Sequence, residues 1–198
     1  MNGRKKLFTY FLSAAVLIPA GLAMSGCARE VIAAEVFQQP VDGHIYTRCN
    51  LWVNNPEAIS SRNIQRGKIL PIGTEVFFTS VTNEEINFTD AEGDSYRILY
   101  DNSEMMMPVE QYLRQTFTLT PPEELLAPYS PETVEKIKKG VVMPGMTGEE
   151  VLLTCGYPIA SRTPSLQNSS WLYFVDDQQT IRIVFRGDKV YELVRSEN

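Results

Sequence analysis

The chain has 198 residues, of which 18 are basic and 24 acidic, and its formal net charge is −6. This negative balance disfavours nucleic acid as a partner and gains nothing from an anionic lipid surface. Hydrophobic residues make up 43% of the chain, which is ordinary for a globular protein.

The start of the chain has the three-part layout of an export signal. Three cationic residues precede an almost unbroken apolar stretch at 7–22, and small residues then lead to Cys27. Removal of residues 1–26 takes three of the 18 basic residues and no acidic one, which leaves a net charge of −9. The length of the apolar stretch also fits an uncleaved anchor, or ordinary cleavage after Ala28 or Ala34.

The run Leu22-Ala23-Met24-Ser25-Gly26-Cys27 resembles the lipobox of bacterial lipoproteins. The resemblance implies that the thiol of Cys27 receives a diacylglyceryl group and that this residue becomes the mature N-terminus. Two or three acyl chains, each methylene contributing about 0.8 kcal/mol on burial, hold a protein on a bilayer. Residues 27–39 are then expected to be a polar and alanine-rich tether.

Residues 40–117 are expected to form a small β-rich domain with a terminal helix. Alternating apolar and polar residues over 45–51 predict a half-buried strand with Cys49 on its apolar face. A long loop is expected at 53–74. Three short strands are predicted after this loop, at 75–81, 86–89 and 95–100. Their tight spacing favours a sandwich or an SH3-like barrel, and Pro108 opens the terminal helix.

The proline-rich segment 118–130 is expected to be a linker between two domains. Ser130 followed by Pro131 then predicts a helix that ends at Lys138 or Lys139, before Gly140.

A second helix start has the capping-box spacing, with Thr147 as the cap and Glu150 bonding back to it. Met146 and Val151 stand at the two positions of a hydrophobic staple.

Gly156 and Pro158 are expected to end this second helix. Three antiparallel strands are predicted after it, at 171–175, 180–185 and 189–194. Two helices followed by three strands predict a two-layer domain over 131–198, with the helices packed on one face of the sheet. The fold class expected for the whole chain is therefore α+β.

Three runs in this last segment resemble the SmpA/OmlA family. They are residues 137–151 with their Gly145-Met146-Thr147 helix start, the helix stop Cys155-Gly156-Tyr157-Pro158, and the strand Trp171-Leu172-Tyr173-Phe174. The family includes the BamE lipoproteins of the outer-membrane β-barrel assembly machinery. The resemblance implies the same two-helix, three-strand fold, which secreted β-lactamase-inhibitor proteins share. The β-rich domain that precedes the module here predicts a relative that works elsewhere in the envelope.

The motif residues have structural rather than catalytic roles in this interpretation. Met146 belongs to the hydrophobic staple, Thr147 and Glu150 form the capping box, and Gly156 and Pro158 end the helix. Trp171 and Tyr173 either fill the interface between sheet and helices or expose one aromatic edge.

Few residues suggest chemistry. His44 is the single histidine, so a second imidazole for a zinc site is missing, and it lies on the opposite strand face from Cys49. Cys49 and Cys155 could form one disulfide or remain buried thiols. The acidic turn 90–94 lacks the final glutamate of a calcium loop, and methionines 105–107 suit gap filling better than metal binding. We therefore expect no enzyme activity, no metal and no cofactor.

The predicted function is that of a lipid-anchored, non-enzymatic interaction or assembly module of the bacterial envelope. Its partners would be the membrane, through the lipid, and an envelope protein. Ala28 rather than aspartate follows the lipidated cysteine, which implies the outer membrane, facing the periplasm. One alternative is a module that binds an envelope glycan or peptide through Tyr46, Trp52 and the loop 53–74. Another, based on fold analogy alone, is an inhibitor of a secreted enzyme.

Overall fold

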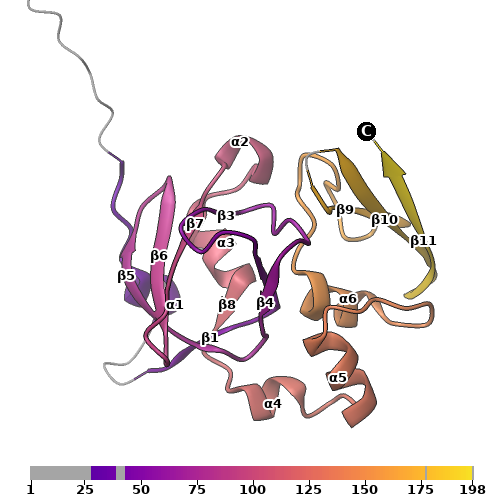
Figure 1. The fold of residues 1–198 in the computed structure, drawn as a ribbon, viewed down its shortest axis with the longest axis horizontal. Helices are drawn as coiled ribbons and strands as arrows, with labels where there is room; N and C mark the ends of the chain where they lie inside the picture. The colour runs from indigo at the N-terminus through magenta and orange to yellow at the C-terminus, as the bar shows by residue number, and fades with distance from the viewer. Residues whose placement is uncertain (1–27, 39–42, 177, 198) are drawn as a thin grey trace, which may run out of the picture.

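The computed structural model describes residues 28–38, 43–176 and 178–197 (Figure 1). The predicted signal segment and the lipidation residue Cys27 lie outside these ranges. The N-terminal part consists of α1 (Ala33–Phe37), β1 (Ile45–Thr47), β2 (Leu51–Val53), β3 (Ile59–Ser60), β4 (Lys68–Leu70), β5 (Glu75–Val81), β6 (Glu85–Asp90), β7 (Ser95–Leu99), α2 (Asn102–Met105), α3 (Val109–Thr116) and β8 (Phe117–Thr118). The C-terminal part consists of α4 (Pro122–Leu126), α5 (Pro131–Lys138), α6 (Gly148–Cys155), β9 (Ser170–Phe174), β10 (Gln179–Arg186) and β11 (Lys189–Glu197).

A curled six-stranded sheet with the order β3-β7-β6-β5-β1-β8 forms the N-terminal part. Its pairings are antiparallel except for the short parallel contact between β3 and β7. The concave side is filled by aromatic rings, with Phe88 and Phe117 at 5.5 Å between ring centroids in an edge-on arrangement. Both rings are at most 1% exposed, and the buried Leu113 of α3 belongs to the same core. The strands predicted at 75–81, 86–89 and 95–100 are confirmed as β5, β6 and β7.

The strand predicted over 45–51 is wrong in one respect, because the chain breaks at residues 48–50. β1 belongs to the six-stranded sheet, whereas β2 pairs with β4 in a separate two-stranded sheet. At the break, the backbone N–H of Arg48 donates to the carbonyl of Thr116 at 2.8 Å, and the side chain of Asn50 turns inward and is fully buried. Hydrogen bonding of Asn50 to distant carbonyls replaces continuation of the strand.

The loop predicted at 53–74 contains two short strands, β3 and β4. β3 pairs with β7, a partner almost forty residues later, in the register Ile59 with Ile98. A two- or three-residue strand has too little alternation to be read from the sequence, so its partner decides where it forms.

The predicted tether is also corrected, because residues 29–37 are built into the β-rich body. Val31 is 7% exposed, and its N–H donates to the carbonyl of Val81 at 2.9 Å. Phe37 of α1 stacks near Phe78 with 6.4 Å between ring centroids. These contacts join residues far apart in the chain, which the polar and alanine-rich composition of the segment did not indicate.

The predicted linker at 118–130 carries secondary structure of its own. Thr118 completes β8 at the edge of the six-stranded sheet, and Pro122 opens α4 at the first helical position. Leu126 of α4 is 8% exposed and belongs to the core of the C-terminal part. The prolines thus set a bend between packed elements.

From α5 onward, the C-terminal part follows the predicted order of two helices and three antiparallel strands, with the sheet order β11-β10-β9. Its core combines Ile137 of α5 and Val151 of α6 with Trp171 and Ile183 of the sheet, all at most 4% exposed. The coarse α+β class is confirmed. Among the described helices, none combines the length and the apolar character that a membrane crossing requires.

Candidate functional site

Two buried asparagines connect the N-terminal and C-terminal parts. The side-chain amide nitrogen of Asn50 donates to the carbonyl of Ile137 at 2.5 Å and to that of Thr154 at 3.1 Å. Its amide oxygen accepts from the backbone N–H of Ile72 at 2.9 Å. The side chain of Asn50 therefore hydrogen-bonds at once to backbone groups at the end of α5, in the last turn of α6 and in the chain between β4 and β5.

Asn63 makes the second connection. Its side-chain nitrogen donates to the carbonyls of Asn50 and Cys155, each at 2.9 Å, and its oxygen accepts from the N–H of Trp52 at 2.8 Å. Asn63 has a φ of 49°, a left-handed conformation that asparagine tolerates better than most residues. We call Asn50 and Asn63 together the asparagine clasp. Because its polar groups are buried and paired, it fixes how the two parts sit on each other.

The two cysteines lie beside this clasp as free, buried thiols, Cys49 at 3% and Cys155 at 1% exposure. A Cβ atom placed on Gly156 would lie 3.2 Å from the sulfur of Cys49, so the thiols flank the same contact between the parts. Burial raises the pKa of both thiols to about 12. Thiolate is the nucleophilic form of cysteine, so neither residue is arranged for covalent catalysis.

The predicted motif residues of the C-terminal part occupy the structural places expected for them. Thr147 accepts from the N–H of Glu150 at 3.2 Å, and the carboxylate of Glu150 accepts from the N–H of Thr147 at 2.6 Å, which completes the capping box. Met146 is 7% exposed and lies in the same core as the fully buried Val151, as a hydrophobic staple requires.

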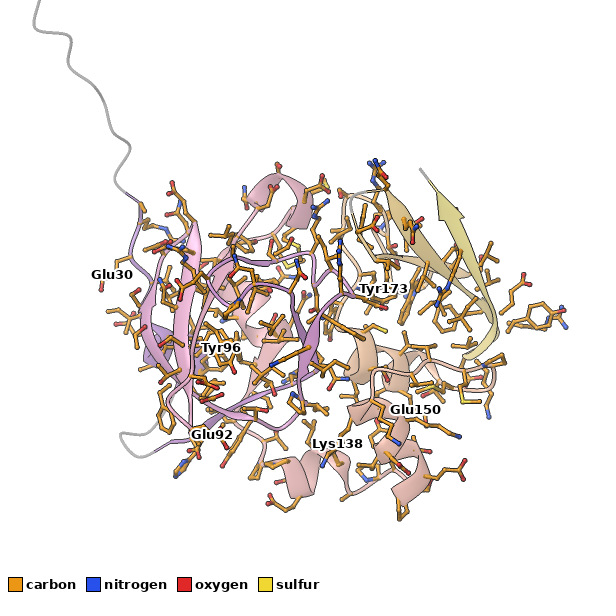
Figure 2. All side chains as sticks on the ribbon, in the orientation of Figure 1. Glu30, Glu92, Tyr96, Lys138, Glu150 and Tyr173 are labelled. Atoms are coloured by element: carbon orange, nitrogen blue, oxygen red, sulfur yellow. The ribbon has the colours of Figure 1, made fainter. Side chains whose placement is uncertain are left out.

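The helix stop and the two aromatic residues are buried together. Gly156 has a φ of 77°, and its carbonyl accepts from the hydroxyl of Tyr173 at 3.0 Å. Pro158 is buried. The indole N–H of Trp171 donates to the carbonyl of Leu166 at 3.2 Å, and its ring packs 4.5 Å from that of Phe185. Trp171 and Tyr173, which are 4% and 3% exposed, therefore fill the interface rather than expose an edge (Tyr173 is labelled in Figure 2).

The candidate ligand aromatics are not brought together. Tyr46 is half-buried on β1 and stacks near His44 with 6.4 Å between centroids. Trp52 lies on β2, in the separate two-stranded sheet, and a Cβ added to Gly140 would meet its ring at 2.6 Å. Trp52 thus packs on the turn that follows α5. Tyr46 and Trp52 therefore belong to different sheets.

The remaining candidates for chemistry have ordinary roles. His44 is exposed and pairs through Nδ1 with the carboxylate of Glu75. Asp90 closes the acidic turn 90–94 by accepting from the N–H of Asp94 at 2.9 Å. Met105 is 1% exposed within the β-rich core. Within the described ranges, no three His, Cys, Asp or Glu side chains group as a metal site would need.

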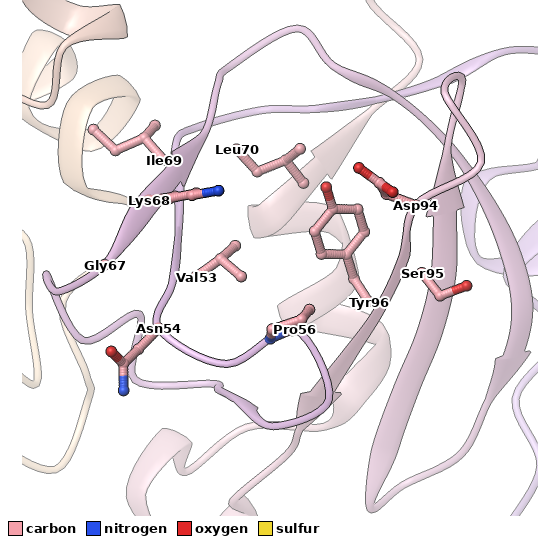
Figure 3. Close-up of a pocket in the computed structure, with 10 residues that line it drawn as sticks. All are labelled: Val53, Asn54, Pro56, Gly67, Lys68, Ile69, Leu70, Asp94, Ser95 and Tyr96. Atoms are coloured by element: carbon pink, nitrogen blue, oxygen red, sulfur yellow. The ribbon is translucent and has the colours of Figure 1, made fainter.

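A groove of about 500 Å³ opens on the surface of the β-rich part (Figure 3). One wall comes from β4 and the residue before it, the other from the start of β7, and the loop after β2 closes one end. Its lining residues are Val53, Asn54, Pro56, Gly67, Lys68, Ile69, Leu70, Asp94, Ser95 and Tyr96. Its volume lies within the range of ligand-binding clefts.

Tyr96 supplies an aromatic surface in this groove. Its ring stacks on Phe88 at 5.3 Å between centroids, and its hydroxyl donates to Asp90 at 2.9 Å. Burial, followed by the hydrogen bond to Asp90, raises the pKa of Tyr96 to about 12, so the hydroxyl stays protonated. Figure 3 places Lys68 and Asp94 on opposite sides of this ring. The groove thus offers an apolar floor with one cation and one anion at its margins.

Sequence reasoning missed the groove and the clasp for different reasons. Tyr96 sits in a predicted strand, where an alternating aromatic is typical of a core position. Asn50 stands at a polar position of the predicted alternation, where an exposed side chain is expected, so the sequence carried no signal for the clasp.

Comparison with known proteins adds no assignment, since no family model, no curated protein and no solved structure matches the chain.

Proposed function

We propose that the chain is a lipid-anchored, non-enzymatic interaction protein of the bacterial envelope, attached through Cys27 and facing the periplasm from the outer membrane. Within this proposal, residues 40–117 act as an SH3-like barrel domain and residues 131–198 as an SmpA/OmlA-like two-layer module. The partner is an envelope protein, and the lipid limits the search for it to a surface, where effective concentration is high.

The observation that carries the proposal is the position of the residues just after Cys27. Arg29 accepts from the N–H of Asn83 at 3.0 Å through its carbonyl, and its N–H donates to the Asn83 side chain at 2.6 Å. Its guanidinium pairs with Glu110 of α3 at 2.8 Å. The chain is thus integrated into the fold two residues after the cysteine.

This integration has a consequence for an anchored protein. Two residues of extended chain span at most about 7 Å. An acyl group on Cys27 would therefore hold the turn between β5 and β6 close to the lipid headgroups. A protein so placed works at the membrane surface, and the acidic body contributes no binding to anionic lipid of its own.

The direct test is metabolic labelling with an alkyne-bearing fatty acid in a bacterial host that expresses the full chain. Wild type is expected to carry the label and Cys27→Ser to carry none. Cys49→Ser is the matched control and should keep the label, because Cys49 is buried. Equal labelling of wild type and Cys27→Ser would rule out the anchor.

The interaction part is tested separately with a photo-crosslinking amino acid. The photo-crosslinking residue is best placed on the edge strand β11, because exposed strand edges can pair with another chain. On this strand Tyr191 is 49% exposed and Val194 is 41% exposed. A probe at Tyr191 should yield a reproducible adduct with one envelope protein, whereas the same probe at the exposed Glu132 of α5 should not. Adducts that are absent, or identical at both positions, would contradict a specific partner at this edge.

A further inference from the structure

At the start of β7, before the residues that pair with β3, the wall of the groove is an open strand edge. The N–H of Arg97 donates to the carbonyl of Pro56 at 2.7 Å, so it points away from β6. In an antiparallel pair, residues two apart point their N–H and C=O the same way. The N–H and C=O of Ser95 therefore also point away from β6, on the groove side. Among the described residues, they have no hydrogen-bond partner there.

The opposite wall offers a second free edge at Ile69. Trp52 directs its N–H to Asn63, away from β4, so Trp52 and Ile69 form a non-hydrogen-bonded pair. The N–H and C=O of Ile69 consequently point away from β2. Its side chain packs toward Gly140, where an added Cβ would meet its Cδ1 at 2.8 Å, so Ile69 lines the groove through its backbone.

The floor between the two edges suits alternating side chains. Val53 and Leu70 project from one face of the two-stranded sheet, and Tyr96 lies opposite them (Figure 3). Lys68 and Asp94 are both exposed at the margins, so each can pair with a charge of the opposite sign. An extended peptide carries what this surface requires, namely a backbone donor and acceptor at each residue and side chains on alternate faces.

We propose that this groove binds an extended peptide segment of a partner protein as an added strand, hydrogen-bonded to Ser95 on β7 and to Ile69 on β4. Strand addition takes its affinity from main-chain hydrogen bonds and its selectivity from pockets for alternate side chains. The inference deepens the proposed interaction function by naming the chemistry of the partner, but it does not depend on the lipid.

The probe is a library of random linear heptapeptides displayed on phage, selected against the full chain in detergent solution. Selected peptides are then synthesised and their affinities measured for wild type and two variants. Ser95→Pro removes the groove-facing N–H without breaking the β6–β7 ladder. Ser95→Ala is the matched control, because it keeps that N–H and removes only the hydroxyl.

Wild type and Ser95→Ala should bind with similar Kd, and Ser95→Pro about tenfold more weakly, the scale of one lost hydrogen bond. Methylation of the central peptide amides should weaken binding as much, and amide hydrogen exchange at Ser95 and Ile69 should slow in the complex. Peptides that bind Ser95→Pro as well as wild type would overturn strand addition. So would a selection that yields no peptide while chitotetraose binds, since that result assigns the groove to a glycan.

A charge variant keeps the test decisive if Ser95→Pro fails to fold. Lys68→Glu changes an exposed side chain at the margin of the groove and leaves the backbone edges intact. The same library should then select peptides with a basic residue where wild type selects an acidic one. Identical selections by both proteins would place the peptides outside the groove. The fatty-acid label reports on the anchor independently, so failure of either proposal can be recognised separately.

Discussion

The two parts of this molecule are determined by different kinds of signal. In the C-terminal part, helix starts are set by contacts three residues apart, such as Ser130 with Thr133 and Thr147 with Glu150. In the N-terminal part, the decisive contacts join distant residues, such as Ile59 with Ile98 and Asn50 with Ile137. The clasp and the groove both belong to the long-range kind. Variants that remove a long-range contact should therefore lower the free energy of unfolding more than variants that remove a local contact.

The largest effect is expected from Asn50→Ala. This change leaves the carbonyl of Thr154 and the N–H of Ile72 buried without the partner that Asn50 supplies, and each such group costs about 1–3 kcal/mol. We expect a loss of about 2–5 kcal/mol in the free energy of unfolding, measured by urea denaturation. Asn168→Ala, at an exposed position, should change it by less than about 0.5 kcal/mol. Equal effects of the two changes would mean that the clasp does not hold the parts together.

Alkaline pH should weaken the contact between the two parts beside the asparagine clasp. The folded state raises the pKa of Cys49 and Cys155 from 9.0 to about 12, so this contribution to stability is present below pH 9 and is lost as pH rises toward 12. Each thiol should lower the unfolding free energy by about 1.4 kcal/mol per pH unit in this window. Denaturation at several pH values checks this slope.

The matched comparison for this pH effect is the double variant Cys49→Ala, Cys155→Ala. It removes the thiols and retains the tyrosines, whose titration also contributes above pH 10. Its slope should be shallower than that of wild type. Parallel slopes would show that the thiols are accessible to water in the folded protein.

Substitution of two glycines by alanine distinguishes the cost of backbone strain from the cost of a steric clash between the two parts. Gly140 and Gly187 have nearly the same φ, 69° and 66°, but only at Gly140 does an added Cβ meet Trp52, at 2.6 Å. Gly187→Ala should cost about 1–2 kcal/mol from the left-handed conformation alone. Gly140→Ala should cost about 1–3 kcal/mol more, because the Trp52 ring and the Ile69 side chain must shift. Thermal denaturation of both variants gives the difference, and identical losses would contradict tight packing of Trp52 against Gly140.

The smallest effect is expected from Thr147→Ala, which removes a local signal. Loss of the cap on α6 should cost about 1 kcal/mol, and Thr147→Ser should retain most of that stability because serine also caps. Far-ultraviolet circular dichroism during denaturation measures this loss of stability. A loss as large as that of Asn50→Ala would remove the distinction between local and long-range determination.

The sequence was sufficient where a structure is determined within a few residues. The caps, the helix ends and the three C-terminal strands were predicted correctly because each has its own turn or capping residues. The break at residues 48–50 was not predicted, since Asn50 bonds to carbonyls 87 and 104 positions away. β3 and β4 were missed for the same reason.

The candidate site was less accessible to prediction than the fold. Tyr46 and Trp52 were the aromatics considered for ligand binding, but Trp52 packs on the turn after α5 and Tyr96 lines the groove instead. Alternation along a strand assigns residues to faces, but it does not tell which face a second sheet covers. The open edges at Ser95 and Ile69 follow only from pairing partners, which the sequence does not specify.

Lipidation of Cys27 is what would hold this protein at a membrane, and the intact mass of the protein extracted from membranes tests it most directly. The mass should equal that of residues 27–198 plus a diacylglyceryl group and an amide-linked acyl chain. The mass of an unmodified 198-residue chain, or of a chain that begins after Ala28 or Ala34, would contradict the lipid anchor.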